Sequence, residues 1–391
     1  MAMPAGLPRI AARAFVPVKE MIFYAPAAMR RVIVLTIFAA VLSLCLAAVG
    51  VAEAQTVQDI EQAWRGWMTK QQRSTGGLVV VHGGRPVHSA QMGRLAAGAP
   101  VPLASLSKAV TGVCIASLID RGRFSFDTRV AEALAKTLVR VGPPADPRLL
   151  QVTIGELLAH RAGFDGKNDA TSGAFGNYLR THTARETAFD AQLKWVIAQR
   201  LPLQPDTKYA YSNAAYLMLG AIIEEATGQS YEAFCRQTVL VPLGARDAEL
   251  DPAWRILASY GGWRMPLADY GRFYQAFAVD NPAIGPVARR WMMQPPFADN
   301  ERAATHYGLG TFVRPTRQGG GNFWHWGRWT YTTNKSFDGP LRISYSTFAV
   351  RIGALDVNMV VYLEPGLQGG PAHGELDRLL GDAARAVTRW P

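Results

Sequence analysis

The stretch Ser105-Leu-Ser-Lys108 is followed directly by the apolar run Ala109-Val-Thr-Gly-Val-Cys-Ile-Ala-Ser-Leu-Ile119. A serine hydroxyl is a weak nucleophile until a base removes its proton. The apolar run predicts a helix, and residues three apart on a helix lie about 5–6 Å apart on one face, so Lys108 can reach Ser105. Burial and the positive end of the helix dipole both disfavour a charged ammonium there. The tetrad therefore suits a nucleophilic serine with a lysine base.

Two other interpretations of the tetrad stay open at this point. Ser107 is the rival nucleophile, although it is adjacent to Lys108 and neighbouring helical residues point in different directions. The tetrad is also compatible with an ordinary helix start, in which Ser105 is the N-cap and Lys108 is solvated. A four-residue match is common by chance, so further elements of a site are needed.

Composition describes a folded protein with a substantial core. The chain has 391 residues, of which 49% are hydrophobic and 18% charged, which is enough for one large domain or two smaller ones. Residues 1–54 hold five Lys or Arg and two Asp or Glu, so without them the net charge falls from +11 to +8. No Lys- or Arg-rich run or nucleic-acid motif occurs, so nucleic-acid binding is not expected.

The N-terminus has the features of a targeting segment. Met29-Arg30-Arg31 precedes an uncharged stretch from Val32 to Val51, and Ala52-Glu53-Ala54 offers an A-x-A cleavage site. We expect residues 1–54 to be a signal peptide whose translation starts near Met29, which leaves a periplasmic or secreted domain over 55–391. The apolar stretch is also long enough to span a bilayer, so an uncleaved anchor is the alternative, and the membrane is a partner only in that case.

Cysteine and histidine spacing predicts no metal site. No C-x-x-C or H-E-x-x-H motif occurs, and we expect no cofactor. Cys114 and Cys235 both fall in apolar helical patterns and are expected to be buried small side chains. Whether they form a disulfide stays open, although an exported protein would permit one.

The hydrophobic pattern predicts strands near both ends of the chain and helices between them. Further helices are predicted over residues 58–71, 157–160, 186–199, 214–226, 231–239, 267–277 and 375–388. Strands are predicted over residues 78–81, 85–90, 308–313, 322–326, 347–352 and 357–363. Gly83-Gly84 predicts a tight turn between the first two strands, Thr153 and Glu156 predict a capping box, and Gly228 predicts a helix C-cap. We therefore expect an α+β fold, with a mostly antiparallel sheet built from both termini and flanked by helices. An all-helical subdomain is expected as an insertion over roughly residues 125–255.

Two downstream tripeptides offer further site residues. Tyr211-Ser-Asn213 lies where the 214–226 helix begins; Tyr211 could relay a proton and Asn213 could bind a substrate carbonyl, or the pair Ser212 and Asn213 could simply cap the helix. His325-Trp-Gly327 lies on a predicted strand, where a glycine often marks close approach of a ligand or another backbone. The N–H groups of Arg328 and Ser105 could then form an oxyanion hole. His325 is alternatively a buried histidine among Trp324, Trp326 and Trp329.

Ser105-x-x-Lys108, Tyr211-Ser-Asn213 and His325-Trp-Gly327, in this order, resemble the three motifs of the serine β-lactamase and penicillin-binding-protein superfamily. The branch most similar is that of the class C β-lactamase-related serine hydrolases. The segment Thr153-Ile-Gly-Glu-Leu-Leu-Ala-His-Arg-Ala-Gly163 is similar to the T-I-x-x-L-L-x-H-x-S-G segment of that family. The resemblance covers roughly residues 75–365, and it implies a β-lactamase/transpeptidase-like fold.

The resemblance also implies a role for each matching residue. Ser105 would be the acylated nucleophile, Lys108 its base partner and Tyr211 the acid/base helper. Asn213 and the strand from His325 to Gly327 would hold the acyl substrate, with Arg328 either a substitute anion contact or an exposed side chain. Class C β-lactamases usually have lysine and a small hydroxyl residue where this chain has His325 and Trp326, which argues against efficient β-lactam hydrolysis.

The sequence thus predicts an exported serine hydrolase that cleaves a small-molecule or peptide ester or amide through an acyl-enzyme. One alternative is a D-aminopeptidase or DD-carboxypeptidase that acts on peptidoglycan peptides. A second alternative, of another class, is a non-catalytic binding protein on the same fold. The intact Ser105, Lys108 and Tyr211 positions favour an enzyme over the binding protein.

Overall fold

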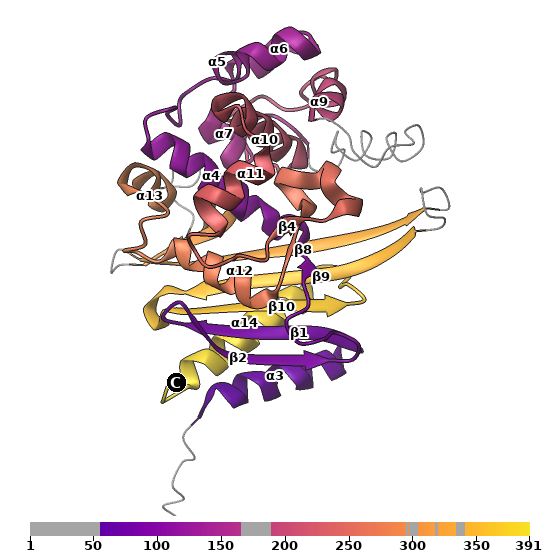
Figure 1. Cartoon of the computed structure of the whole chain (residues 1–391), viewed down its shortest axis with the longest axis vertical. Helices are drawn as coiled ribbons and strands as arrows, with labels where there is room; N and C mark the ends of the chain where they lie inside the picture. Colours follow the sequence, from indigo (N-terminus) through magenta and orange to yellow (C-terminus); the bar gives the residue numbers. More distant parts are fainter. Residues whose placement is uncertain (1–54, 166–188, 295–296, 298–303, 317–319, 334–340) are drawn as a thin grey trace, which may run out of the picture. The chain divides into compact units, whose positions relative to one another are not determined.

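The computed structural model describes residues 55–165, 189–294, 297, 304–316, 320–333 and 341–391 (Figure 1). Within these residues, seven strands form one sheet in the order β2-β1-β10-β9-β8-β7-β6, and all its neighbouring pairs are antiparallel. The N-terminal hairpin β1–β2 therefore pairs with the C-terminal strand β10. The predicted fold class, a mostly antiparallel sheet built from both termini and flanked by helices, is confirmed.

In the large sheet, β8 and β9 are the longest strands, and β6 and β7 at one edge are the shortest. Its strands are β1 (Thr75–His82), β2 (Arg85–Met92), β6 (His306–Gly308), β7 (Thr311–Pro315), β8 (Gly321–Thr333), β9 (Leu341–Ile352) and β10 (Val357–Glu364). The helices are α3 (Val57–Lys70), α4 (Ser107–Asp120), α5 (Val130–Ala133), α6 (Ala135–Val141), α7 (Ile154–Leu158), α9 (Phe189–Ile197), α10 (Asn213–Thr227), α11 (Tyr231–Cys235), α12 (Leu267–Phe273), α13 (Pro286–Met293) and α14 (Pro371–Ala386).

The sheet separates two apolar cores, because alternate side chains of a strand point to opposite faces. In β1, Leu78 and Val80 pack with α3 and α14, whereas Val79 and Val81 pack on the opposite face, toward the remaining helices. Both faces of β1 are therefore covered, which is why its run Leu78 to Val81 is continuously apolar rather than alternating.

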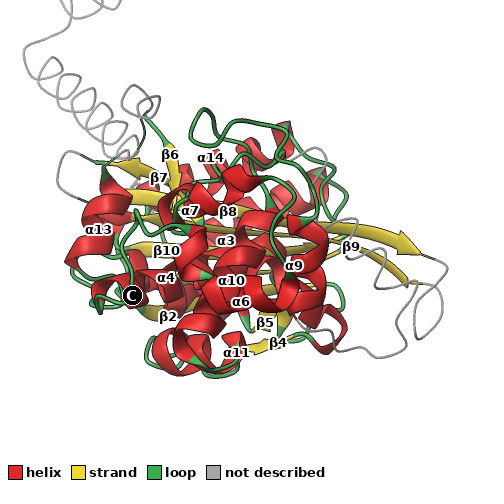
Figure 2. Ribbon diagram, turned by 90° about the horizontal axis from the view of Figure 1, so that it is seen from above, coloured by secondary structure: helices red, strands yellow, loops and turns green. Residues whose placement is uncertain are grey.

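Figure 2 shows α6, α9, α10 and α11 in front of the strands of the large sheet. The helices α5 to α11 fall between the N-terminal and C-terminal strands in the sequence, where an inserted helical subdomain is predicted over roughly residues 125–255. That region is not purely helical, because it also contains the two-residue strand β4 (Glu249–Leu250). With β3 (Val101–Pro102) and β5 (Trp263–Met265), β4 forms a small antiparallel sheet in the order β3-β5-β4. The helix α4, buried except at Ser117 and Asp120, contacts this insertion and lies on the same face of the large sheet.

Several helix ends lie where the capping residues of the sequence predict them. Thr153 and Glu156 form the predicted capping box, with Glu156 N–H donating to Thr153 Oγ1 and Thr153 N–H to the Glu156 carboxylate. Gly228 ends α10 in the left-handed conformation that glycine adopts without strain. The helices predicted at 231–239 and 267–277 are shorter than expected, since each changes to a π or 3₁₀ turn after its first five to seven residues.

The prediction of one strand over residues 308–313 is wrong. β6 ends at Gly308 and β7 begins at Thr311, and the turn between them places Leu309 at φ 50° and Gly310 at φ 80°. Positive φ at both central residues is characteristic of the type I′ two-residue hairpin turn. This turn packs so closely on α4 that a Cβ atom at Gly310 would overlap the Lys108 carbonyl.

Cys114 of α4 and Cys235 of α11 are both buried and are joined as a disulfide, with their Cα atoms 5.8 Å apart. This answers the question that the sequence left open. Among the helices of the described ranges, none combines the length and the apolar character needed to cross a membrane. The predicted signal segment, residues 1–54, lies outside the described residues.

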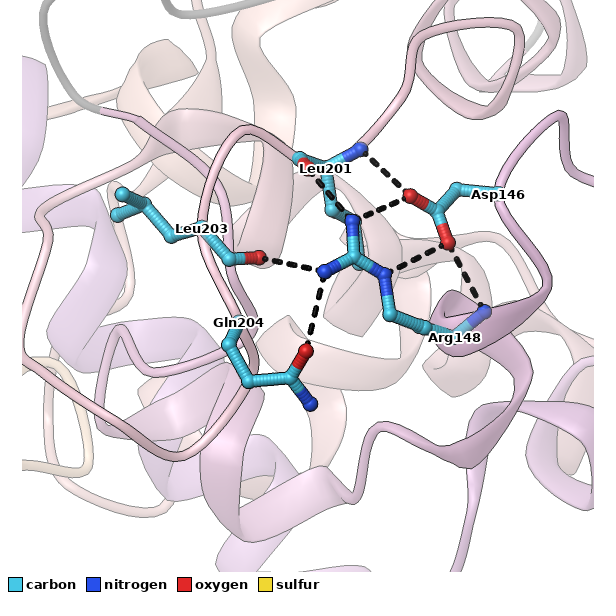
Figure 3. A network of polar contacts seen from close by, with 5 residues as sticks. All are labelled: Asp146, Arg148, Leu201, Leu203 and Gln204. Atoms are coloured by element: carbon cyan, nitrogen blue, oxygen red, sulfur yellow. Dashed lines mark hydrogen bonds and ion pairs between the residues drawn. The ribbon is translucent and has the colours of Figure 1, made fainter.

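A polar network holds the long connection from α9 to α10, which leads to Tyr211 (Figure 3). The Arg148 guanidinium is paired with the Asp146 carboxylate and donates to the Leu201 carbonyl and the Gln204 side chain. Asp146 in turn accepts from the Leu201 N–H. The hydrogen bond from Arg148 holds the pKa of Asp146 well below its usual range, so the pair stays charged at neutral pH.

Candidate active site

Ser105 lies in the 3₁₀ turn η1 (Ala104–Leu106), immediately before α4, and is partly exposed. Lys108, in the first turn of α4, is completely buried, and its Nζ lies 3.3 Å from Ser105 Oγ. Ala104 has φ 48°, a left-handed conformation that costs a residue with a Cβ free energy. Strained residues of this kind are concentrated at functional sites, where surrounding structure holds them in place.

The two open alternatives for the tetrad are not supported by this geometry. Ser107 is completely buried, and its Oγ accepts a hydrogen bond from the Trp263 N–H at 3.1 Å, so it points into the core. Lys108 is not a solvated lysine, since it has no exposed surface. Ser105 forms no side-chain cap of α4, whose N-cap position is Leu106.

Lys108 Nζ donates to two acceptors besides Ser105. These are Asn213 Oδ1 at 2.6 Å and the Tyr260 carbonyl at 2.9 Å. Asn213 is the first residue of α10, while Ser212 is its N-cap and accepts from the Ala214 N–H. The capping task in the second motif therefore falls to Ser212, which leaves the Asn213 side chain for the lysine.

Tyr211 lies close to both Lys108 and His325. Lys108 Nζ is 4.7 Å from the centre of the Tyr211 ring, and the Tyr211 ring centre is 6.0 Å from that of His325. The structure thus brings Ser105, Lys108, Tyr211 and Asn213 together from η1, α4 and the start of α10. Tyr211 and Asn213 lie beside Ser105, more than 100 positions away in the sequence, because α10 packs on α4.

His325 of β8 is buried and neutral. Its Nδ1–H donates to the Trp326 carbonyl at 2.6 Å, so its Nε2 accepts from the Tyr307 hydroxyl at 2.9 Å. Burial, and then the nearby Lys108, lower the pKa of His325 to about 3. Burial raises the pKa of Tyr307 well above its usual value, so this hydroxyl keeps its proton and remains a donor. At neutral pH His325 therefore supplies no positive charge where class C enzymes usually have a lysine.

Gly327 allows the nucleophile turn to approach β8. A Cβ atom at Gly327 would overlap the Leu103 carbonyl and the Thr347 hydroxyl and would press on Ala104. The same Thr347 hydroxyl donates to the Leu103 carbonyl at 2.8 Å, which ties the turn to β9. The sequence predicted that a ligand or another backbone segment approaches Gly327, and the structure shows that the backbone of the nucleophile turn does so. This contact places Ser105 beside β8, at a point along β8 beyond the end of its pairing with β7.

Trp326 and Arg328 have side chains on the opposite face of β8. The Trp326 ring stacks on Phe348, with ring centres 4.1 Å apart, and on His373 of α14 at 3.9 Å. Arg328 shares that face by the alternation of the strand and is exposed. Trp326 therefore does not place its bulk beside the substrate, where class C β-lactamases usually have a small hydroxyl residue. For Arg328, the sequence left open a substrate anion contact or an exposed side chain, and the structure shows an exposed side chain.

Three groups at this site carried no clear signal in the sequence. The Tyr260 carbonyl holds Lys108, but every residue has a carbonyl, so only the fold can select it. Tyr307 bonds His325 across the β6–β7 hairpin, which the sequence pattern did not reveal. His160 contacts Tyr211, with ring centres 4.4 Å apart. The segment from Thr153 to Gly163 resembles a family motif, but the sequence predicts no role for the His160 side chain.

A cavity of about 210 Å³ lies next to these residues. Its walls include the aromatic rings of Tyr209, Tyr307 and Phe312, with Arg161 and His306 among its polar lining groups. Tyr307 is shared between the cavity and the hydrogen bond to His325, so the cavity and the site have a wall in common.

Comparison with known proteins indicates the family to which this chain belongs. Residues 57–344 match the family model described as Beta-lactamase. Penicillin-binding protein 4 of Amycolatopsis lactamdurans is 34% identical over 141 residues, which are 36% of this chain and 33% of that protein. Esterase EstB of Burkholderia gladioli is 29% identical over 178 residues, 45% of this chain and 42% of that protein.

A solved structure gives the same result for the fold. The D-stereospecific amidohydrolase from Streptomyces sp. superposes with a TM-score of 0.64 at 16% identity, over 84% of this chain and 98% of that one. The matched part of this chain spans about a third of the length of the first curated relatives. The family match itself covers well over half of the chain, and by this match the chain belongs to the Beta-lactamase family of serine β-lactamase and penicillin-binding-protein folds.

Proposed function

We propose that this chain is an exported serine hydrolase that cleaves an ester or amide through an acyl-enzyme on Ser105. The observation that carries the proposal is the environment of Lys108, whose Nζ is completely buried 3.3 Å from Ser105 Oγ. Similar proteins named Esterase EstB, Putative D-alanyl-D-alanine carboxypeptidase and D-stereospecific amidohydrolase support this class of reaction.

The contacts of Lys108 with Ser105, Asn213 and Tyr260 suit a neutral amine. An amine has two N–H bonds and one lone pair, whereas an ammonium has three N–H bonds and no lone pair. As an ammonium, Lys108 donates to all three acceptors; as an amine that donates to Asn213 Oδ1 and the Tyr260 carbonyl, it can accept the Ser105 hydroxyl proton at the third contact. Full burial favours the neutral form of a lysine. Lys108 would accept the proton as Ser105 Oγ forms its bond to the substrate carbonyl carbon.

The tetrahedral intermediate needs donors for its negative oxygen. We assign these donors to the backbone N–H groups of Ser105 and Arg328, which belong to η1 and β8, two elements in contact at Gly327. Backbone donors that are already in place cost no reorganisation during the reaction. The buried position of Gly327 keeps the two elements close, so this residue would set the size of the oxyanion hole.

Tyr211 is assigned the proton transfer to the leaving group. Its ring centre lies 4.7 Å from Lys108 Nζ. When the C–O or C–N bond of the tetrahedral intermediate breaks, the Tyr211 hydroxyl gives its own proton to the leaving oxygen or nitrogen. Lys108, which holds the proton taken from Ser105, then returns a proton to the phenolate. A water molecule, activated by the same groups, then releases the acyl group from Ser105.

The substrate is expected to be an ester or a neutral amide rather than a carboxylate-terminated peptide or a β-lactam. Recognition of a substrate carboxylate is served by a cation, and His325, with a pKa of about 3, is uncharged at neutral pH. The Arg161 guanidinium in the wall of the neighbouring cavity is buried and donates to the Asp206 carbonyl, so we do not assign it to the substrate. The aromatic walls of the neighbouring cavity, Tyr209, Tyr307 and Phe312, favour a flat apolar group on the substrate. This preference ranks the DD-carboxypeptidase alternative second.

Turnover of a substrate panel by the full chain tests the proposal. The panel contains short acyl and naphthyl esters, D-amino acid amides and D-Ala-D-Ala peptides. We expect ester hydrolysis that Ser105→Ala abolishes, with Ser107→Ala as the matched control that keeps a measurable rate. Faster cleavage of D-Ala-D-Ala peptides than of esters would favour the carboxypeptidase, and an inert protein would favour the binding-protein alternative.

Export is proposed from the sequence of residues 1–54. Protein recovered from the expressing cells and sequenced from its N-terminus is expected to begin at Gln55 and to be released with the periplasmic fraction or the medium. Recovery of the uncleaved chain in the membrane fraction would support the anchored alternative instead.

A further inference from the structure

We propose that His160 is a positioning residue, which holds Tyr211 in the place needed for proton transfer to the leaving group. This inference rests on the proposed function, in which Tyr211 is the proton donor. His160 follows α7 directly, is 1% exposed and has φ 57°. A non-glycine residue in the left-handed region merits a reason, and the contacts of His160 provide one.

His160 binds the backbone on both sides of Tyr211. The Ala210 N–H donates to the His160 carbonyl at 2.8 Å, and the Ser212 N–H donates to His160 Nδ1 at 3.2 Å. The residue thus fixes the peptide groups before and after the tyrosine through one backbone atom and one side-chain atom. Because Ser212 also caps α10, the same contact ties Tyr211 to the helix that carries Asn213.

The His160 ring also packs against the tyrosine itself. The ring centres of His160 and Tyr211 are 4.4 Å apart, and the Tyr307 and Tyr216 rings lie at 4.5 and 5.0 Å from His160 on other sides. These contacts leave the imidazole little freedom to rotate. A rigid ring gives Tyr211 a fixed surface, which preserves the geometry that proton transfer requires.

The protonation state of His160 fits an acceptor at Nδ1. Burial is the main cause that holds the pKa of His160 well below its ordinary value, so the ring is neutral. Nδ1 must carry a lone pair to accept from Ser212, which places the proton on Nε2. Within the described residues, the buried Nε2 has no hydrogen-bond partner.

Two substitutions separate the hydrogen bond from the ring. His160→Asn keeps an acceptor, Oδ1, close to the position of Nδ1, and asparagine tolerates positive φ. His160→Phe keeps a ring of similar size but removes the acceptor. If His160→Phe does not fold by circular dichroism, His160→Gln replaces it, because glutamine moves its acceptor one bond away from the Ser212 N–H.

Leaving-group dependence identifies a defect in proton donation. An alkyl ester releases an alcohol that needs a proton, whereas a p-nitrophenyl ester releases a stable anion that does not. We expect His160→Phe to lower kcat for an ethyl ester by roughly 10²-fold, in the range of general acid catalysis, with KM changed far less. The p-nitrophenyl ester should lose only a few-fold, Tyr211→Phe should show the same pattern, and His160→Asn should restore most of the ethyl ester rate.

A double variant and a control complete the test. If His160 acts through Tyr211, then Tyr211→Phe combined with His160→Phe is no slower on the ethyl ester than Tyr211→Phe alone. His373→Phe, on the opposite face of the sheet, is the control for the loss of a buried imidazole and should leave both rates unchanged. Equal losses on the two esters, or multiplied losses in the double variant, would overturn the inference. Failure of Ser105→Ala to abolish turnover would instead overturn the proposed function on which it rests.

Discussion

The two faces of β8 differ in what they bury. On the face toward α4, His325 and Gly327 meet a buried lysine, a tyrosine and the backbone of the nucleophile turn, and the contacts are hydrogen bonds and close backbone approach. On the face toward α14, Trp326 stacks between Phe348 and His373. His325 and Trp326 are adjacent in the sequence, but one lies at the candidate site and the other in the apolar core, because alternate side chains of a strand point to opposite faces.

This difference separates activity from stability. Buried polar groups add little to net stability even when they are paired, and they become costly when one partner is lost. Stacked aromatic rings contribute through the apolar area that they remove from water and through ring contact. We therefore expect substitutions on the α4 face to change the rate of reaction most, and substitutions on the α14 face to change the free energy of unfolding.

The largest effect is expected at Lys108. Lys108→Met removes the base but keeps a straight side chain of similar length, so kcat for an ester should fall by roughly 10³–10⁴-fold. Asn213 Oδ1 and the Tyr260 carbonyl lose a donor, which should cost about 1–3 kcal/mol of unfolding free energy. Steady-state kinetics together with thermal unfolding measure both. A variant that keeps more than a tenth of the rate would show that another group is the base.

Trp326 provides the opposite result on the α14 face. Trp326→Ala deletes a partly buried ring and both of its stacks, so the free energy of unfolding in urea should fall by about 3 kcal/mol. The rate per folded molecule should stay within about threefold of the unmodified protein, because the ring does not face Ser105. Trp326→Phe, which keeps one aromatic stack, is the matched control and should lose less stability. A large fall in kcat for the alanine variant would break the distinction between the two faces.

The smallest effect is a pH dependence from the buried histidines. An unfolded histidine has a pKa near 6.5, and His325 has a pKa of about 3 when folded, so the unfolded state binds more protons between these values. Stability from this group is complete above pH 6.5 and is lost as pH falls, by about 2 kcal/mol at pH 5.

Substitution of His325 should make this dependence weaker. His325→Phe removes the contribution, so its unfolding free energy should fall less steeply between pH 6.5 and pH 4 than that of the unmodified protein. His373→Phe on the α14 face should change the slope over a narrower range, since burial lowers the pKa of His373 only to about 4. Urea unfolding at several pH values measures the slopes, and equal slopes for His325→Phe and the unmodified protein would contradict a neutral buried His325.

The fold could be predicted from the sequence wherever local chemistry decides it. The capping box at Thr153, the C-cap at Gly228 and the Gly83-Gly84 hairpin turn each act within a few residues, and each lies where expected. The β6–β7 hairpin could not be predicted, because its turn places Leu309 at positive φ. That conformation is maintained by tertiary packing on α4, which leaves no mark in the local pattern.

The site was predictable only in part. Three motifs located Ser105, Tyr211 and His325, and the structure gathers them around Lys108. The faces of His325 and Trp326 follow from strand alternation, but only when the direction of one side chain is known. The role of His160 could not be predicted from the sequence, because its contact with Ser212 joins residues 52 positions apart.

Covalent labelling tests the identity of the nucleophile most directly. The full chain is treated with a fluorophosphonate, and intact-protein mass spectrometry with peptide mapping locates the adduct. The geometry of Lys108 predicts one adduct, on Ser105, that disappears in Ser105→Ala and persists in Ser107→Ala. An adduct on Ser107, or no adduct from a protein that still hydrolyses esters, would contradict the assignment of Ser105 as the nucleophile.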